Sequence, residues 1–277
     1  MAFEFKRGAL LLMAILGQTG CGAFPGQRPD ASAHFEAAEV AALAQAACDG
    51  DAAEVAERVA AGVPVSATGK ADITPLGFAA TCGSPEGVRA LLQAGADPNY
   101  RHQGKMTTTW VAAGFDQPEA LAALLDAGGD MHAADNRGDT VLMRAFALGG
   151  LTLEGNAWGN YEMLLARGVN LNQAGDMGYG IADIATAMGR FDKIAELLER
   201  GFTYDLLSSA WATENRAVSP DQQPHVERVK VLLKARGVKW PIPVPLNDEN
   251  RNAYMRAHPE YAEKHPESWP IDHGKPE

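Results

Sequence analysis

Hydrophobic residues occur along this chain in short blocks that have the spacing of amphipathic helices. The segment "TPLGFAATCG" at 74–83 carries an apolar face of leucine, phenylalanine and alanine, and its opening Thr-Pro pair is typical of a helix start. Val88, Leu91 and Leu92 follow at the i, i+3, i+4 spacing of a second helix. Gly95 predicts the end of that helix, because glycine readily adopts the left-handed conformation found there.

The two-helix pattern returns at a nearly constant interval. The stretch "LLQAGADPN" at 91–99 recurs as "LLDAGGDMH" at 124–132 and as "LLARGVNLN" at 164–172. Segments aligned with position 74 begin at 107, 140 and 180, at spacings of 33, 33 and 40 residues, and the first marker shows the same 33 followed by 40. The glycines that end the second helices are Gly62, Gly95, Gly128, Gly168, Gly201 and Gly237. This period predicts an array of one repeated supersecondary unit.

The recurring residues resemble the ankyrin repeat, in which T-P-L-x-x-A-A is followed by G-x-x-x-x-V-x-x-L-L-x-x-G-A-D-x-N. The resemblance covers roughly residues 37–240 and implies an all-α solenoid of about six helix–turn–helix repeats with short hairpin loops. Repeats are expected near 37–69, 70–102, 103–135, 136–175, 176–204 and 205–240, the first and last being degenerate as capping repeats. The family's usual histidine is replaced by Gly77, Trp110, Met143 and Asp183. These helices should therefore lose a customary side-chain hydrogen bond.

The resemblance also implies a binding surface made of the hairpin tips and the first helix of each repeat. The tip residues expected to contact a protein partner are Tyr100, Arg101, His102, Met106, His132, Asn136, Arg137, Met177 and Tyr179. Those from the first helices are Trp110, Phe115, Met143 and Arg144, with the Arg144 guanidinium directed toward this face. Trp110 is the favoured anchor because a large aromatic replaces a small polar residue there, and the alternative is packing against a neighbouring helix.

One interval is longer than the others and contains seven extra residues between Gly149 and Tyr161. Insertions in repeat arrays form loops that often carry function. Trp158 lies in this insertion, where it is either an interface anchor or local cover for the array. Asp97 and Asn99 are oxygen ligands in type, but their counterparts are spread over several repeats. They are therefore interpreted as hairpin-turn residues and not as a calcium site.

The N-terminus has the features of a secretory signal. Lys6 and Arg7 precede an apolar run at 8–17, whose helix would measure about 15 Å against a bilayer core of about 30 Å. Residues 1–20 are therefore expected to be a signal peptide. The "QTGC" that ends at Cys21 resembles the lipobox of bacterial lipoproteins, although Gln18 departs from the usual leucine-like residue. Lipidation of Cys21 would make 21–36 a lipidated tether, whereas ordinary cleavage would leave a free thiol.

This resemblance implies a periplasmic protein tethered to a membrane by its lipid. Gly22 is not acidic, which favours the outer membrane. The net charge of −11 argues against nucleic acid and against an anionic membrane surface, and it would suit a basic protein partner. The chain is expected to be monomeric when unbound.

The spacing of the cysteines does not decide whether Cys48 and Cys82 form a disulfide. Cys48 and Cys82 occupy nearly equivalent positions in adjacent repeats. Contacting helices lie about 8–10 Å apart, which is longer than the Cα separation of about 4.4–6.8 Å that a disulfide requires. The one-residue offset could shorten this distance, and the periplasm is oxidising. A disulfide and two buried thiols therefore both remain possible readings.

The chain carries no recognisable catalytic motif, and no cofactor or metal is expected. The Pro-rich tail at 241–277 is predicted to hold a short helix from Asp248, and either to wrap the last repeat or to be partly disordered. The aromatic residues that could pack on the last repeat are Tyr254, Tyr261 and Trp269. The tail histidines His258, His265 and His273 are interpreted as solvated, and a metal site is the lesser alternative.

Together these features predict a non-catalytic scaffold that blocks a protein such as a secreted antibacterial toxin, as immunity proteins do. One alternative is an envelope stress scaffold like the ankyrin proteins found beside catalases. A remote alternative is an enzyme with its site in the tail.

Overall fold

The computed structural model describes residues 29–151, 158–176, 178–244 and 246–266. The chain forms two compact units, unit 1 up to Val169 and unit 2 from Asn170. Within the described ranges the regular elements are helices, accompanied by two isolated β-bridges, Arg101 with Thr107 and Ala134 with Thr140. The predicted all-α fold class is therefore confirmed for this part of the chain.

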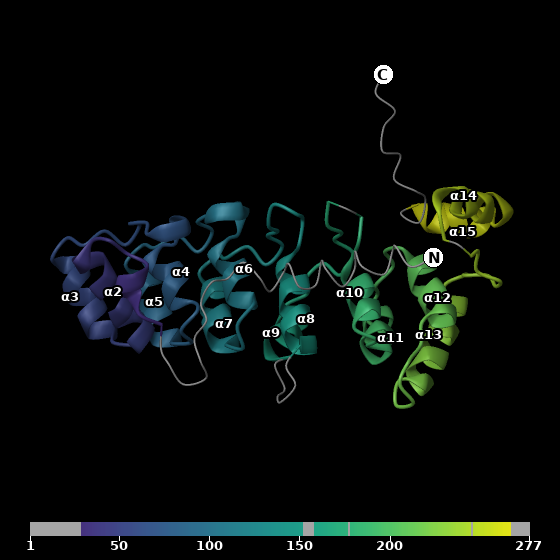
Figure 1. The fold of residues 1–277 in the computed structure, drawn as a ribbon, viewed down its shortest axis with the longest axis horizontal. Coiled ribbons are helices and arrows are strands. Elements are labelled where there is room, and N and C mark those ends of the chain that lie inside the picture. Colours follow the sequence, from purple (N-terminus) through teal and green to yellow (C-terminus); the bar gives the residue numbers. More distant parts are fainter. Residues whose placement is uncertain (1–28, 152–157, 177, 245, 267–277) are drawn as a thin grey trace, which may run out of the picture. The chain divides into compact units, whose positions relative to one another are not determined.

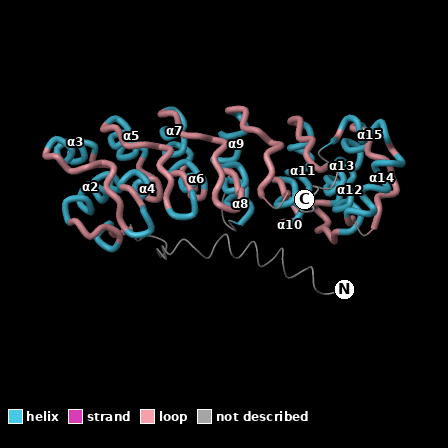
Figure 2. The backbone as a smooth tube through the Cα atoms, turned by 90° about the horizontal axis from the view of Figure 1, so that it is seen from above, coloured by secondary structure: helices cyan, strands magenta, loops and turns pink. Residues whose placement is uncertain are grey.

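Unit 1 consists of consecutive helix pairs with short 3-10 turns. The bounds are η1 (Ala31–Ala33), α2 (Ala38–Asp49), α3 (Ala52–Ala60), η2 (Lys70–Asp72), α4 (Pro75–Ala79), α5 (Pro85–Gln93), η3 (Gln103–Lys105), α6 (Thr108–Ala113), α7 (Pro118–Asp126), α8 (Val141–Leu151) and α9 (Gly159–Ala166). Each pair packs against the next, because α2 contacts α4 and α5, α5 contacts α7, and α6 contacts α8. Figures 1 and 2 show these pairs side by side in chain order.

Threonine caps start the first helices at one-repeat intervals. Thr74 Oγ1 accepts a hydrogen bond from the Gly77 amide at 3.1 Å, and Thr107 Oγ1 accepts one from the Trp110 amide at the same distance. These bonds satisfy amide groups that a helix start would otherwise leave without a partner. The helix starts predicted from the Thr-led segments are therefore confirmed.

The six aligned glycines adopt the backbone conformation predicted for helix ends. Their φ angles lie between 75° and 98° at Gly62, Gly95, Gly128, Gly168, Gly201 and Gly237. At Gly95 a Cβ atom would meet nothing within 4 Å, so conformation and not space requires glycine there. Asp97 Oδ1 accepts from the Asn99 amide, and the Asn99 side chain bonds to the backbone of Gly128 and Asp130 in the next repeat. "LLQAGADPN" is thus a helix end followed by a turn.

The packed part of unit 1 begins before position 37. Phe35 is buried and makes an edge contact with Phe78 at 6.0 Å between ring centroids, and the Ala31 amide donates to Gln45 Oε1 at 3.0 Å. Residues 31–35 therefore pack against α2 and α4, whereas the sequence suggested a tether at 21–36. The signal peptide and Cys21 lie outside the described residues.

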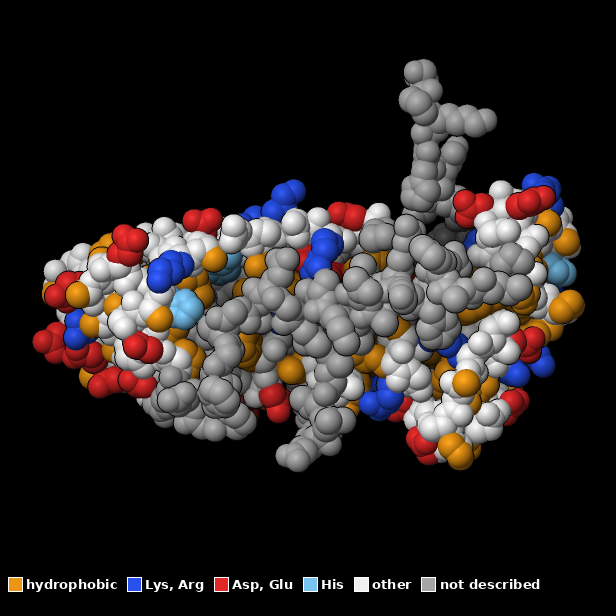
Figure 3. Space-filling model, viewed as in Figure 1, with side chains coloured by type: hydrophobic (Ala, Val, Ile, Leu, Met, Phe, Trp, Pro, Cys, Tyr) orange, Lys and Arg blue, Asp and Glu red, His pale blue; other side chains and the backbone are white. Residues whose placement is uncertain are grey.

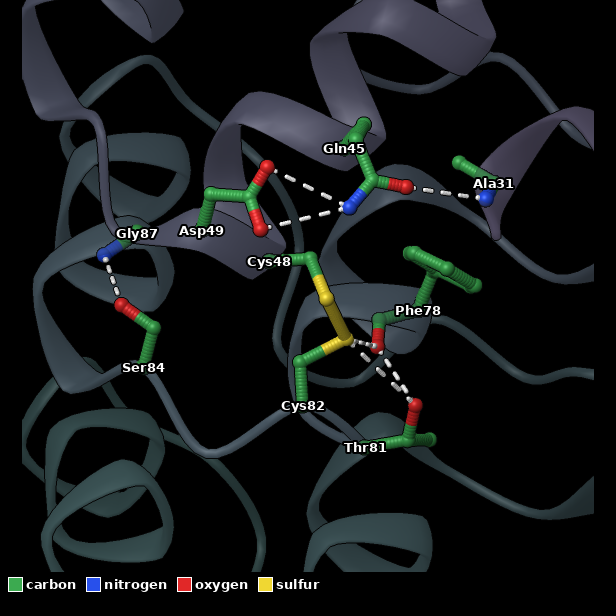
Figure 4. The surroundings of a disulfide bond; sticks show 9 residues. All are labelled: Ala31, Gln45, Cys48, Asp49, Phe78, Thr81, Cys82, Ser84 and Gly87. Carbon is green, nitrogen blue, oxygen red and sulfur yellow. Dashed lines mark hydrogen bonds between the residues drawn. A yellow bond between two sulfur atoms is a disulfide. The ribbon is translucent and has the colours of Figure 1, made fainter. Parts of the chain in front are cut away.

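A disulfide joins the first two helix pairs. It links Cys48, near the end of α2, to Cys82, in the turn after α4, with a Cα–Cα distance of 5.2 Å (Figure 4). This distance is shorter than the spacing of helix axes because Cys82 lies beyond the end of its helix. Of the two readings of these cysteines, the structure contains the disulfide.

Unit 2 contains two further helix pairs and the tail helices. The bounds are α10 (Ile181–Ala187), α11 (Phe191–Glu199), α12 (Leu206–Asn215), α13 (Gln223–Ala235), α14 (Asp248–Ala257) and α15 (Pro259–Lys264). The predicted helix start at Asp248 is confirmed. No helix among the described residues of either unit has the length and apolar character needed to cross a membrane.

The tail packs on the last helix pair through specific polar contacts. Arg251 in α14 forms two hydrogen bonds with the Asp205 carboxylate, at 2.7 and 2.9 Å. The buried Tyr254 hydroxyl accepts from the Lys239 amide and donates to the Lys239 carbonyl. Tyr261 is also buried, so wrapping by these two tyrosines is confirmed, while Trp269 lies outside the described residues.

Candidate functional site

The hairpin tips are built by one recurring hydrogen bond. In unit 1 the amides of Gly69, His102 and Asp135 donate to the carbonyls four residues later, at 2.8 to 3.1 Å. In unit 2 the amide of Gly175 makes the same bond to Tyr179 at 2.9 Å. The donor positions 69, 102, 135 and 175 are separated by 33, 33 and 40 residues, which matches the sequence period. The tips are therefore equivalent positions on a repeated frame.

Several predicted contact residues do reach solvent on these tips. Arg101, His132 and Asn136 are exposed, and Tyr100, Met106, Arg137 and Tyr179 are partly exposed, as is Phe115 in the turn after α6. Met177 lies outside the described residues. The Asn136 amide donates to the Gly104 carbonyl at 2.9 Å, which ties the second and third tips of unit 1 together. Their exposed side chains are therefore held on linked backbones.

Trp110 is not the exposed anchor that the sequence suggested. Its side chain is only 3% exposed, and its indole Nε1 donates a hydrogen bond of 2.6 Å to the Asp139 carbonyl of the next repeat. An aromatic side chain buried in this way fills the interface between repeats and offers no surface to a partner. The prediction was wrong because the following repeat covers this position. Met143 is only 2% exposed, so its prediction as a contact residue is also corrected.

Arg144 packs on the Trp110 ring. Its guanidinium carbon lies 4.8 Å from the Trp110 ring centroid, a cation–π geometry, and a Cβ on Gly114 would overlap it. Burial lowers the pKa of Arg144, followed by the nearby charge of Arg137. Arg144 is partly exposed, and its direction toward the binding face stays a prediction. Arg137 on the adjacent tip forms ion pairs with Asp135 and Asp139 at 3.3 and 3.5 Å.

His102 is a structural side chain. Its Nδ1 lies 3.0 Å from the Asp72 carbonyl, so Nδ1 carries the proton, and Nε2 accepts from the Thr108 hydroxyl at 3.0 Å. The ring lies over Gly77, where a Cβ would come within 2.6 Å of His102 Cε1. Burial lowers the pKa of His102, which keeps the imidazole neutral. His102 therefore fills the space above Gly77, and its prediction as a contact residue is corrected.

Trp158 acts as local cover. It is 8% exposed and makes edge contacts with Phe146 and Tyr161, at 5.2 and 5.4 Å between ring centroids. The alternative role as an interface anchor is therefore wrong. Sequence reasoning also missed the buried Asn160 of α9, whose Nδ2 donates to the Phe115 carbonyl at 2.5 Å and so caps the end of α6. A polar residue in an apolar helix was the available signal.

Charge is distributed unevenly over unit 1. Exposed carboxylates gather at the end formed by α2 and α3, among them Glu39, Asp51 and Glu57 (Figure 3). In the described part of the chain no three His, Cys, Asp or Glu side chains gather as a metal site. In the tail, His265 is buried with Nε2 3.1 Å from the Arg236 carbonyl, so its interpretation as solvated is corrected. His258 is partly exposed, and its ring is tilted at 58° to that of Tyr254.

A family model described as the ankyrin repeat matches residues 72–103, a segment that spans α4, α5 and the start of the second tip. A search of curated proteins finds no match to the chain. Ankyrin repeats generally mediate binding between proteins and typically lack enzymatic activity. Residues 72–103 are therefore similar to an ankyrin repeat, and the next helix pair repeats their threonine cap and helix-end glycine.

Proposed function

We propose that this protein is a non-catalytic binding scaffold of the bacterial envelope, and that its hairpin tips contact a protein partner. The supporting observation is the set of tip side chains that remain exposed on a repeated, hydrogen-bonded backbone: in unit 1 Arg101, His132 and Asn136 with the partly exposed Tyr100, and in unit 2 the partly exposed Tyr179. These side chains differ from tip to tip while the backbone repeats. Such an arrangement gives specificity through side chains held on a rigid scaffold.

The envelope location rests on two further observations. Disulfides persist in oxidising compartments such as the bacterial periplasm, and Cys48 and Cys82 form one. The N-terminal sequence resembles a lipoprotein signal ending at Cys21. We propose an anchor at Cys21, with the outer membrane favoured by Gly22, and a protein that is monomeric until it meets its partner.

The proposed partner is a secreted antibacterial toxin, which the scaffold would block by occluding its active site. The net charge of −11 and the carboxylates at the α2 and α3 end favour a basic partner through electrostatic steering.

Affinity capture from envelope extracts tests the binding function. The immobilised chain should retain one protein saturably at micromolar concentration or below, and the function is refuted if nothing is retained. A basic toxin would support the immunity role, whereas a catalase-associated stress factor would assign the scaffold to envelope stress. The anchor needs its own test: a labelled fatty acid should be incorporated by the wild type and lost in Cys21→Ser. Labelling that survives this substitution would disprove the anchor.

A further inference from the structure

A hollow lies against the disulfide, away from the hairpin tips. It is open to solvent and has a volume of about 300 Å³. Its wall consists of Cys48 and Cys82, small residues at Gly50 and 83–85, and two carboxylates, Asp49 and Glu86. Figure 4 shows the disulfide with Asp49 and Ser84 around it. The disulfide therefore lies at the wall of a hollow, beside small side chains and negative charge.

The two sulfur atoms differ in their surroundings. Cys48 is 3% exposed and packs in the core cluster with Ala44 and Phe78. Cys82 lies in the turn between α4 and α5 and is only partly buried. Disulfides open when a thiolate attacks one sulfur and the other departs, so access decides which sulfur reacts. Cys82 packs against the same cluster but is the more exposed of the two residues, so its sulfur is the expected target.

The two carboxylates, Asp49 and Glu86, make the hollow negatively charged. Asp49 is held by the Gln45 amide, whose Nε2 lies 3.3 Å from both carboxylate oxygens. Glu86 is exposed and is only partly offset by Arg89, whose Nη1 lies 3.7 Å from Glu86 Oε1. An approaching anion is therefore repelled, and a thiol that carries a positive charge is favoured.

We propose that this hollow is a thiol–disulfide exchange site that selects cationic thiols over anionic ones. An incoming thiolate forms a bond to Cys82 Sγ, the bond between the two cysteines breaks, and its electron pair leaves with Cys48 Sγ, which takes a proton from water. A second thiolate then attacks the sulfur of the bound thiol and releases Cys82 as a thiolate. Two thiols are oxidised to one disulfide, and both cysteines of the protein are reduced.

Two small thiols of equal length and opposite charge test the proposal. The probes are 2-aminoethanethiol and 2-mercaptoethanesulfonate, used on the full chain carrying Cys21→Ser, so that Cys48 and Cys82 are its remaining cysteines. Rates are expressed per thiolate, and the first adduct is located by mass spectrometry after alkylation of the released thiol. We expect the adduct on Cys82 and a cation preference on the order of tenfold at low salt, which decreases at high salt.

Matched variants isolate the role of the carboxylates. Asp49→Asn with Glu86→Gln should reduce the preference toward unity. Asp116→Asn with Glu119→Gln, exposed acids at the corresponding turn one repeat later, should leave it unchanged. Circular dichroism checks that each variant is folded. Equal rates for the two probes in the wild type, a first adduct on Cys48, or the same loss of preference in the control pair would overturn the proposal.

Discussion

Opening the Cys48–Cys82 disulfide removes the covalent link between α2 and the turn after α4. Reduction alone leaves both side chains in place, whereas Cys48→Ala with Cys82→Ala also removes a buried sulfur. The two perturbations share one effect, because both free the unfolded chain from a cross-link between residues separated by 34 positions. They therefore separate the effect of the cross-link from the effect of packing.

The size of the effect follows from the length of the closed loop. The chain-entropy relation for a loop of this length gives about 4 kcal/mol at 25 °C. Loss of the buried Cys48 sulfur should add about 1 kcal/mol in the alanine pair. In a repeat array each unit contacts its neighbours, so the loss should be greatest in α2 to α5.

Native-state hydrogen exchange measures this effect element by element. Because every 1.4 kcal/mol is tenfold, reduction should speed exchange of the α2 amides by about a thousandfold, through openings that break the loop contacts. The α11 amides in the other unit serve as the internal control and should change little.

Two results would refute this reasoning. If reduction raised the exchange rate of the α2 amides by less than tenfold, native contacts and not the cross-link would hold the first helix pairs together. If the exchange rates of the α2 and α11 amides rose equally, the destabilisation would not be local.

Three further predictions concern single side chains. Gly77→Ala should lower the free energy of unfolding, measured with urea, by about 1–3 kcal/mol because its Cβ would press on His102. Adding His102→Ala should recover most of this loss, and simple additivity of the two losses would contradict the contact. Burial raises the pKa of Asp183, so its ionised form destabilises the fold at neutral pH and stability should rise as pH falls through this raised pKa. Asp183→Asn should lack that rise, and a wild type without it would refute the pKa direction. Arg251→Ala should lower exchange protection in α14 by about 2 kcal/mol through loss of the Asp205 bonds, and unchanged protection would show that the tail docks by apolar contacts.

The features that could be predicted from sequence were local ones. The threonine cap at position 74 and the left-handed glycine at position 95 depend on the backbone of a few neighbouring residues, and each recurs at the repeat period. Asn99 was likewise predicted as a turn residue from its counterparts in other repeats. Repetition strengthened each assignment, because the same local pattern was observed several times.

The features that were missed depend on contacts between repeats. Trp110 and Met143 were expected on the surface, but both are buried, and the Trp110 indole bonds to the backbone of the next repeat. Arg144 lies against Trp110 because Gly114 leaves space for its guanidinium. The spacing of residues within one repeat does not reveal how a neighbouring repeat fills such a space, so exposure on the first helices could not be derived from sequence.

The most direct test compares tip and non-tip variants in binding to the partner captured from the envelope. The tip variant combines Tyr100→Ala, Arg101→Glu and His132→Ala, and the control combines Gln93→Ala with Glu119→Ala on the exposed sides of α5 and α7. If the tips carry the binding surface, Kd for the tip variant should rise at least about tenfold and the control should stay within about twofold. An unchanged Kd for the tip variant, or an equal rise in the control, would contradict a protein-binding role for the hairpin tips.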